Sequence, residues 1–150
     1  MMFKTHVAFG FLAGVISISY FNPANQILFI VLVMLGAMLP DIDHPKSKIG
    51  SKFKIIGFLF EHRGFFHSFL AIPLIAAIIF YFTSSLTYIM PLGIGYASHL
   101  VSDAVTKEGI MPLHPLTRLR LRGFIKTAGA LEYVLFLIIV IFASYKLITL

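Results

Sequence analysis

The chain has 150 residues, of which 59% are hydrophobic and only 12% are charged. A soluble domain usually carries about 25% charged residues, so the polar surface needed by a water-exposed globule is missing and a membrane protein is indicated. The net charge of +6 falls mainly in two blocks between apolar segments, as in cytoplasmic loops, which argues against nucleic-acid binding. Because cysteine is absent, disulfides, thiolate nucleophiles and cysteine-type zinc sites are excluded.

The apolar segments predict an all-α fold, an integral membrane bundle of about five transmembrane helices in a single domain over residues 1–150. The first segment follows Lys4 as in a signal peptide, but no cleavage pattern follows it, so it is interpreted as a retained helix. The first two segments are the shortest. The five ranges are approximately Val7–Phe21, Gln26–Pro40, Phe65–Phe82, Leu86–Val105 and Thr127–Tyr145.

Small residues in the first two segments favour close helix packing. Gly10 and Gly14 have GxxxG spacing, and Gly36 precedes Ala37.

Two long loops, at about residues 41–64 and 106–126, carry most of the basic residues, whereas the connections at 22–25 and 83–85 carry no charge. The positive-inside rule therefore places both long loops and the N-terminus in the cytoplasm and, after five spans, the C-terminus outside. Apolar residues at helical spacing between Ile49 and Phe60 predict a helix on the membrane surface. Alternating Leu and Arg over 116–123 favour an extended or irregular segment near anionic head groups.

Histidine and carboxylate side chains gather at the predicted cytoplasmic ends of four or five segments. Imidazole and carboxylate together suit zinc, manganese or iron, whereas an all-oxygen set would favour magnesium or calcium. We therefore predict a site for one or two divalent metal ions, with zinc preferred. The candidate ligands are His6, Asp41, Asp43, His44, His67, His99 and Asp103.

The spacing of His99 and Asp103 puts both side chains on one face of a helix, one turn apart. Each candidate also has a plain structural interpretation. His6 could be an interfacial residue, Asp41 could be an ordinary helix-end residue, and His99 with Asp103 could be a buried hydrogen-bonded pair. Seven candidate ligands are more than one four-coordinate ion needs. Either some of them hydrogen-bond to the residues that bind the ion, or the site holds two ions.

Three further residues are candidates for catalytic roles. Arg63 could hold a phosphate group bidentately, or could be a topogenic anchor. Asp41 and Asp43 are the candidates to bridge two metal ions. Glu132 could act as general base, or could only pair with a nearby arginine.

The motifs at 36–44 (GAMLPDIDH), 62–68 (HRGFFHS) and 95–103 (GYASHLVSD) resemble the LexA-regulated, inner-membrane, metal-dependent hydrolase family (YdjM-like). Thr5-His6, Gly109 to Pro112 and His114-Pro115 fit the same pattern, so the resemblance covers most of the chain. It implies a multi-pass helical protein of the cytoplasmic (inner) membrane with metal-dependent hydrolase activity. The motifs also loosely resemble helical zinc phospholipases.

These observations predict a membrane-embedded metal-dependent hydrolase with its active site at the cytoplasmic interface. Membrane lipids are the expected partners, and a phosphoester or lipid-like molecule is the expected substrate. The alternatives are a metal or ion transporter and a non-catalytic scaffold stabilised by metal. The sequence predicts no particular oligomeric state.

Overall fold

The computed structural model describes residues 1–43 and 64–149. In these residues the secondary structure is helical, and the only strand-like pairings are two isolated bridges. The predicted all-α fold is therefore confirmed. The α-helices are α1 (Phe3–Phe21), α2 (Gln26–Gly36), α4 (Ala71–Thr83), α5 (Leu86–Ala104) and α6 (Ala130–Ile148), and two short 3-10 helices are η1 (Leu39–Asp43) and η3 (Phe65–His67).

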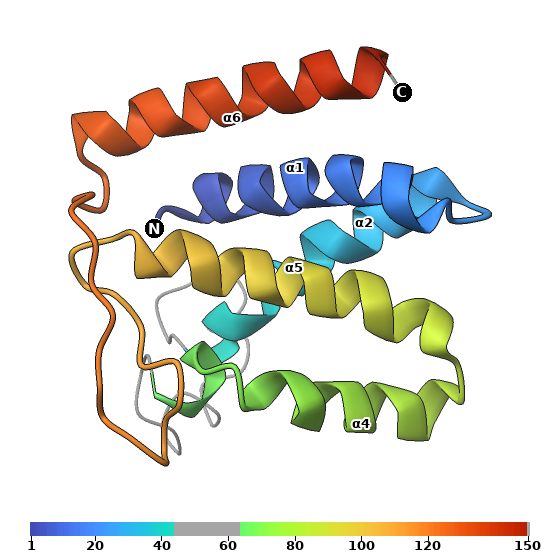
Figure 1. Cartoon of the computed structure of the whole chain (residues 1–150), viewed down its shortest axis with the longest axis horizontal. Coiled ribbons are helices and arrows are strands. Elements are labelled where there is room, and N and C mark those ends of the chain that lie inside the picture. Colours follow the sequence, from blue (N-terminus) through green and yellow to red (C-terminus); the bar gives the residue numbers. More distant parts are fainter. Residues whose placement is uncertain (44–63, 150) are drawn as a thin grey trace.

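Helix α5 is the centre of the bundle and packs against α1, α2 and α4, whereas α6 packs on α1 at one edge (Figure 1). The α1–α2 and α4–α5 turns lie at one end of the molecule. The N-terminus and the chain between α5 and α6 lie at the opposite end (Figure 1). The start of α1, the end of α5 and the start of α6 therefore lie at the same end of the bundle.

The α1–α2 turn lies at the uncharged connection predicted at residues 22–25. Asn22 ends α1 in the left-handed conformation (φ 39°), and its backbone N–H donates to the carbonyl of Ile18. Asn25 then caps α2, because its side-chain oxygen accepts from the backbone N–H of Leu28 at 2.9 Å. Asparagine suits both positions, since it tolerates the left-handed region and caps helix N-termini well.

Glycines bring the backbones of α1, α2 and α5 into close contact, as the small residues predict. A Cβ at Gly10 would lie 2.7 Å from the Cβ of Ala37, and one at Gly95 would lie 1.9 Å from the Val33 carbonyl oxygen. A Cβ at Gly36 would similarly lie 2.2 Å from the carbonyl oxygen of Leu92. The α2–α5 crossing therefore depends on the absence of side-chain atoms at these positions.

The third predicted helix begins later than its sequence suggests. Residues 65–67 form the separate turn η3, and α4 begins only at Ala71. Ser68 between them has extended backbone (φ −118°, ψ 155°), and the next amide, of Phe69, donates to the carbonyl of Pro112 at 2.9 Å. This tertiary hydrogen bond replaces the helical one, so the continuous apolar run gives two elements. The predicted extension of α2 to Pro40 is likewise replaced by η1.

Two helices of the described chain, α1 and α6, are long and apolar enough to cross a membrane. Helices α2 and α4 have 11 and 13 residues. At 1.5 Å per residue these correspond to about 16 and 20 Å, less than the ~30 Å of a hydrocarbon core. The five-span bundle is therefore not confirmed and stays a prediction.

The segment after α5 folds back on itself, in agreement with the predicted extended or irregular structure. Bridges join Thr106 to Ile125 and Ile110 to Leu121. Ile110 is buried and packs with Leu100 of α5 in an apolar cluster, which holds the segment against the bundle. The surface helix expected between residues 49 and 60 lies outside the described residues.

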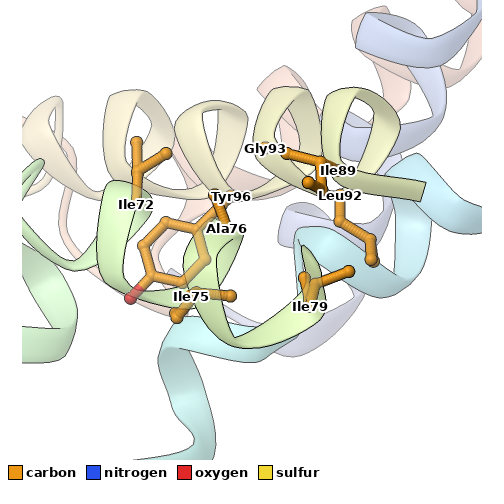
Figure 2. A pocket seen from close by; sticks show the side chains of 8 residues that line it. All are labelled: Ile72, Ile75, Ala76, Ile79, Ile89, Leu92, Gly93 and Tyr96. Carbon is orange, nitrogen blue, oxygen red and sulfur yellow. The ribbon is translucent and has the colours of Figure 1, made fainter. Parts of the chain in front are cut away.

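Tyr96 of α5 contacts both α4 and η3. Its ring lies beside Ile72 and Ile75, and these three residues help to line a small apolar cavity of about 30 Å³ between α4 and α5 (Figure 2). Its hydroxyl donates to the backbone carbonyl of Phe66. Because Phe66 directly precedes His67, this hydrogen bond fixes η3 relative to α5.

Candidate metal centre

Five of the seven predicted ligands converge at one end of the bundle, where α1 begins and α5 ends (Figure 1). They form two overlapping groups that share one histidine, and within each group the ligand atoms lie within 4.8 Å of one another. All are buried except Asp41, whose side chain is 17% exposed. The groups are His6, His99 and Asp103, and Asp41, His67 and His99.

The shortest separations place one oxygen of Asp41 and one of Asp103 close to the same two histidine nitrogens. The Nε2 atoms of His67 and His99 are 3.4 Å apart. Asp103 Oδ2 lies 3.6 Å from His67 Nε2 and 3.8 Å from His99 Nε2. Asp41 Oδ1 lies 4.0 Å and 3.9 Å from the same two nitrogens. Ligand bonds of about 2.0–2.1 Å in a tetrahedron require neighbouring ligand atoms about 3.3 Å apart, and these five separations exceed that value by less than about 1 Å.

The ring orientation of His99 is fixed by a backbone carbonyl. Its Nδ1 lies 2.8 Å from the carbonyl oxygen of Ala37. A carbonyl oxygen only accepts, so Nδ1 carries the proton and donates. In the neutral ring, Nε2 therefore presents a lone pair to Asp41, His67 and Asp103. A histidine that binds a metal usually has this arrangement, with the other ring nitrogen donating to a carbonyl or carboxylate.

A second hydrogen-bond chain orients His6 in the same way. The Ser102 hydroxyl donates to the carbonyl of His99 at 2.7 Å, so its oxygen is left to accept. His6 Nδ1 lies 2.7 Å from that oxygen and donates to it. His6 Nε2 then faces Asp103 Oδ1 at 3.5 Å with a lone pair. The His6 and His99 rings stack, with centroids 3.8 Å apart.

Apart from the Met1 α-amino group, which pairs with Asp103 Oδ1, these oriented groups are hydrogen-bond acceptors. The lone pairs of His6 and His99 and the carboxylates of Asp41 and Asp103 face one another inside the protein. Such groups repel each other unless a cation or proton lies between them, and an unbalanced buried charge is costly. The donor set of imidazoles and carboxylates therefore fits a divalent metal ion of the zinc type.

Glu132 occupies a different position from the five clustered residues. It is buried at the start of α6 and accepts from the backbone N–H groups of Met2 at 2.6 Å and Ala128 at 2.7 Å. The adjacent α-amino group of Met1 donates to Asp103 Oδ1. The N-terminal segment thus connects Glu132 to the edge of the cluster, and the catalytic role of Glu132 stays a prediction.

The remaining predicted site residues cannot be placed. His44 and Arg63 lie outside the described residues, as does the side chain of Asp43, which ends η1.

Sequence reasoning missed two groups that the structure adds to the site, the Ser102 hydroxyl and the Ala37 carbonyl. Ser102 follows His99 by three residues, so helical spacing could have identified it as a neighbour. No sequence signal marks a single carbonyl.

The model of the YdjM inner membrane protein family matches residues 1–149 of the chain. The chain belongs to this family. This match confirms the resemblance to the YdjM family that the sequence motifs indicated. It also confirms that the family is one of inner membrane proteins. The family description names a location and no reaction, and regulation by LexA is not confirmed.

Similar proteins come from several bacteria. The protein YvsG of Bacillus subtilis (strain 168) is 39% identical over 140 residues, which cover 86% of this chain and 83% of YvsG. The inner membrane protein YdjM of Escherichia coli (strain K12) is 38% identical over 92 residues, or 55% of this chain and 46% of that protein. YdjM of Shigella flexneri gives the same values, so the aligned region spans about half the length of the YdjM proteins. No solved structure matches the chain.

Proposed function

We propose that the chain is a membrane-embedded metal-dependent hydrolase whose active site is the cluster at the cytoplasmic interface. The observation that carries the proposal is the buried set of acceptors, with imidazole lone pairs turned toward carboxylates by outer hydrogen bonds. Asp41, His67, His99 and Asp103 would hold the ion, with zinc as the expected metal and manganese or iron as alternatives that suit the same ligands.

A second ion is compatible with the two oxygens of Asp103. Oδ2 faces His67 and His99, whereas Oδ1 faces His6. His99 has only Nε2 available, because Nδ1 is bound to a carbonyl. Asp103 could therefore bridge two ions, with His6 as a ligand of the second, provided that the second ion displaces the Met1 α-amino group from Oδ1. Asp43 stays a further candidate for the bridging role.

A bound divalent ion supplies Lewis acidity, which polarises a scissile bond and makes coordinated water more acidic. The protein contributes orientation, since the hydrogen bonds of His6 and His99 hold both rings before any substrate arrives. In the proposed reaction Arg63 binds the phosphate of a phosphoester or lipid-like substrate, and Glu132 or an unligated carboxylate accepts a proton.

Metal content gives the first test. Asp41→Asn and Asp103→Asn each replace a charged ligand with a neutral side chain of the same shape, so both should lower bound zinc at least tenfold. Glu108→Gln is the matched control, because it removes a carboxylate outside the cluster. The full chain is purified in detergent, and its metal is measured by mass spectrometry. Metal content equal in all three variants and the unaltered protein would refute the metal centre.

Hydrolysis gives the second test. The zinc-loaded protein should hydrolyse a member of a panel of phosphomonoesters, phosphodiesters and short-chain phospholipids, and Asp103→Asn should lower that rate at least a hundredfold. A chelator should abolish the rate, and added zinc should restore it. If the zinc-loaded protein binds metal stoichiometrically but cleaves no member of the panel, the proposed substrate class is wrong.

A structural metal is the competing function, and one observation favours it. The five clustered residues come from four elements, α1, η1, η3 and α5, so an ion there would also join four parts of the chain. A purely structural ion would raise the unfolding temperature without any hydrolysis, whereas a catalytic ion leaves a position open to water or substrate.

A further inference from the structure

We propose that the folded segment between α5 and α6 binds a phosphate group in a basic pocket. The pocket has a volume of about 310 Å³ and is lined by Met111, His114, Arg118, Arg120 and Arg122. None of the five clustered metal ligands lines it. The proposed site is therefore distinct from the metal centre and does not depend on metal being bound.

The backbone of the segment explains how three arginines reach one pocket. Leu121 forms a bridge with Ile110, in which each backbone N–H donates to the other's carbonyl, at 2.8 and 3.0 Å. In an extended backbone, successive side chains point to opposite sides, so side chains two residues apart lie on the same side. Arg118, Arg120 and Arg122 have this spacing and line the pocket.

The leucines between these arginines face away from the pocket and are largely exposed. Leu119 is 67% exposed and Leu121 is 47% exposed, and nearby Leu116 and Phe124 are 74% and 73% exposed. The segment therefore combines a basic pocket with apolar side chains of the kind that insert at a membrane surface.

Within the described part of the chain, no ion pair joins the three arginines of the pocket to a carboxylate. Arg120 donates to the backbone carbonyl of Glu108 at 3.3 Å. The Glu108 carboxylate accepts from the Thr127 hydroxyl at 2.7 Å. Arg118 and Arg122 make no ion pair with any described residue. Three guanidinium groups of like charge repel one another, so an anion between them is favoured.

A buried ring nitrogen supplies a further polar group. His114 lines the pocket, and its Nδ1 is buried without a hydrogen-bond partner among the described residues. A buried polar atom without a partner costs free energy, which a ligand that hydrogen-bonds to it would recover. The imidazole and the guanidinium groups thus offer several converging polar contacts.

Phosphate is the anion whose chemistry best fits these groups. Guanidinium groups donate pairs of parallel hydrogen bonds to phosphate oxygens, and several of them together select an anion with more than one charged oxygen. The phosphate could belong to a lipid head group or to a small soluble molecule. Both share the same tetrahedral anion, and separate probes distinguish them.

The test uses the full chain in detergent, treated with a chelator to remove metal. Calorimetric titrations with inorganic phosphate and with dihexanoyl phosphatidic acid, a soluble short-chain lipid, give the two dissociation constants. The double variant Arg118→Gln, Arg122→Gln should weaken binding of the preferred probe by at least tenfold. Lys107→Gln is the control, because it removes one positive charge from the same segment without touching the pocket.

Binding of both probes identifies a site for phosphate itself, and binding of the lipid probe alone identifies a head-group site. Either result, with the loss in the double variant, supports the proposal. Binding of neither probe, or equal affinity in the double variant and the Lys107→Gln control, would overturn it. Asp103→Asn should bind phosphate normally, so failure of the metal centre and failure of this site give different results.

Discussion

At the scale of single residues, the centre is defined by proton positions as much as by ligand identity. Ala37 fixes the proton of His99, and Ser102 fixes that of His6, so that both Nε2 lone pairs face the carboxylates. Ser102 also donates to the carbonyl of His99, which connects the two histidines through one hydroxyl. The Ser102 hydroxyl, which lies outside the ligand set, therefore orients the ring of His6, and stacking on His99 supports the same ring.

Ser102→Ala tests this connection. It removes the acceptor for His6 Nδ1, frees the ring to rotate, and should lower zinc affinity about tenfold, the lower end of what such outer hydrogen bonds contribute. Ser98→Ala is the matched control, because the Ser98 hydroxyl also donates to a carbonyl three residues back, that of Gly95, but contacts no histidine. Competition titrations with a chromophoric chelator measure both affinities. Equal affinities in the two variants would mean that His6 takes no part in metal binding.

At the scale of helices, the centre depends on how closely α5 approaches α2. Gly95 lies one turn before His99 on the same face of α5. The backbone of Gly95 packs so closely on the Val33 carbonyl that no Cβ would fit between them. Because this crossing brings Ala37 within hydrogen-bonding distance of His99, helix packing and ring orientation are set by the same contact.

Gly95→Ala should therefore damage stability and metal binding together. Its Cβ would lie 1.9 Å from the Val33 carbonyl oxygen, so the helices must separate, and overpacking of this kind costs about 1–3 kcal/mol. Gly93→Ala is the control, since a Cβ there meets nothing within 4 Å. Thermal unfolding in detergent and bound zinc are measured for both. A Gly95→Ala protein as stable and as zinc-rich as Gly93→Ala would show that the close crossing is not required.

At the scale of the whole molecule, the two ends of the bundle differ in chemistry. The start of α1, the end of α5 and the segment after α5, which supply the metal centre and the basic pocket, lie at one end (Figure 1). The α1–α2 and α4–α5 turns at the other end carry no charged residue. This polarity is what the positive-inside rule predicts for an N-terminus in the cytoplasm and a C-terminus outside. The short helices α2 and α4 make the number of spans a question for experiment.

The absence of cysteine makes this topology easy to test. In intact cells, a membrane-impermeant maleimide should label Ala24→Cys and Ser84→Cys from outside, and Lys107→Cys only after permeabilisation. These positions lie in the α1–α2 turn, the α4–α5 turn and the segment after α5. Labelling of Lys107→Cys in intact cells would reverse the predicted orientation. Protection of Ser84→Cys would contradict spans at α4 and α5.

The sequence alone determined the features that depend on composition and local spacing. Low charge indicated a membrane protein, uncharged turns located the first and third helix connections, and the position of each histidine and aspartate along its segment predicted their gathering at one end. These properties are local, so neighbouring residues suffice to predict them. Three motifs, at 36–44, 62–68 and 95–103, were enough to indicate the YdjM family.

Only the tertiary structure decided which of those residues meet and how. His67 lies in the short 3-10 helix η3 rather than in α4 because Tyr96 and Pro112, distant in sequence, hydrogen-bond to residues beside it. The Nε2 lone pairs of His6 and His99 face the carboxylates because the Nδ1–H groups of these rings donate to the Ser102 hydroxyl and the Ala37 carbonyl. A binding site is a set of distances between separate elements, and those distances are set by helix packing, which no local pattern contains.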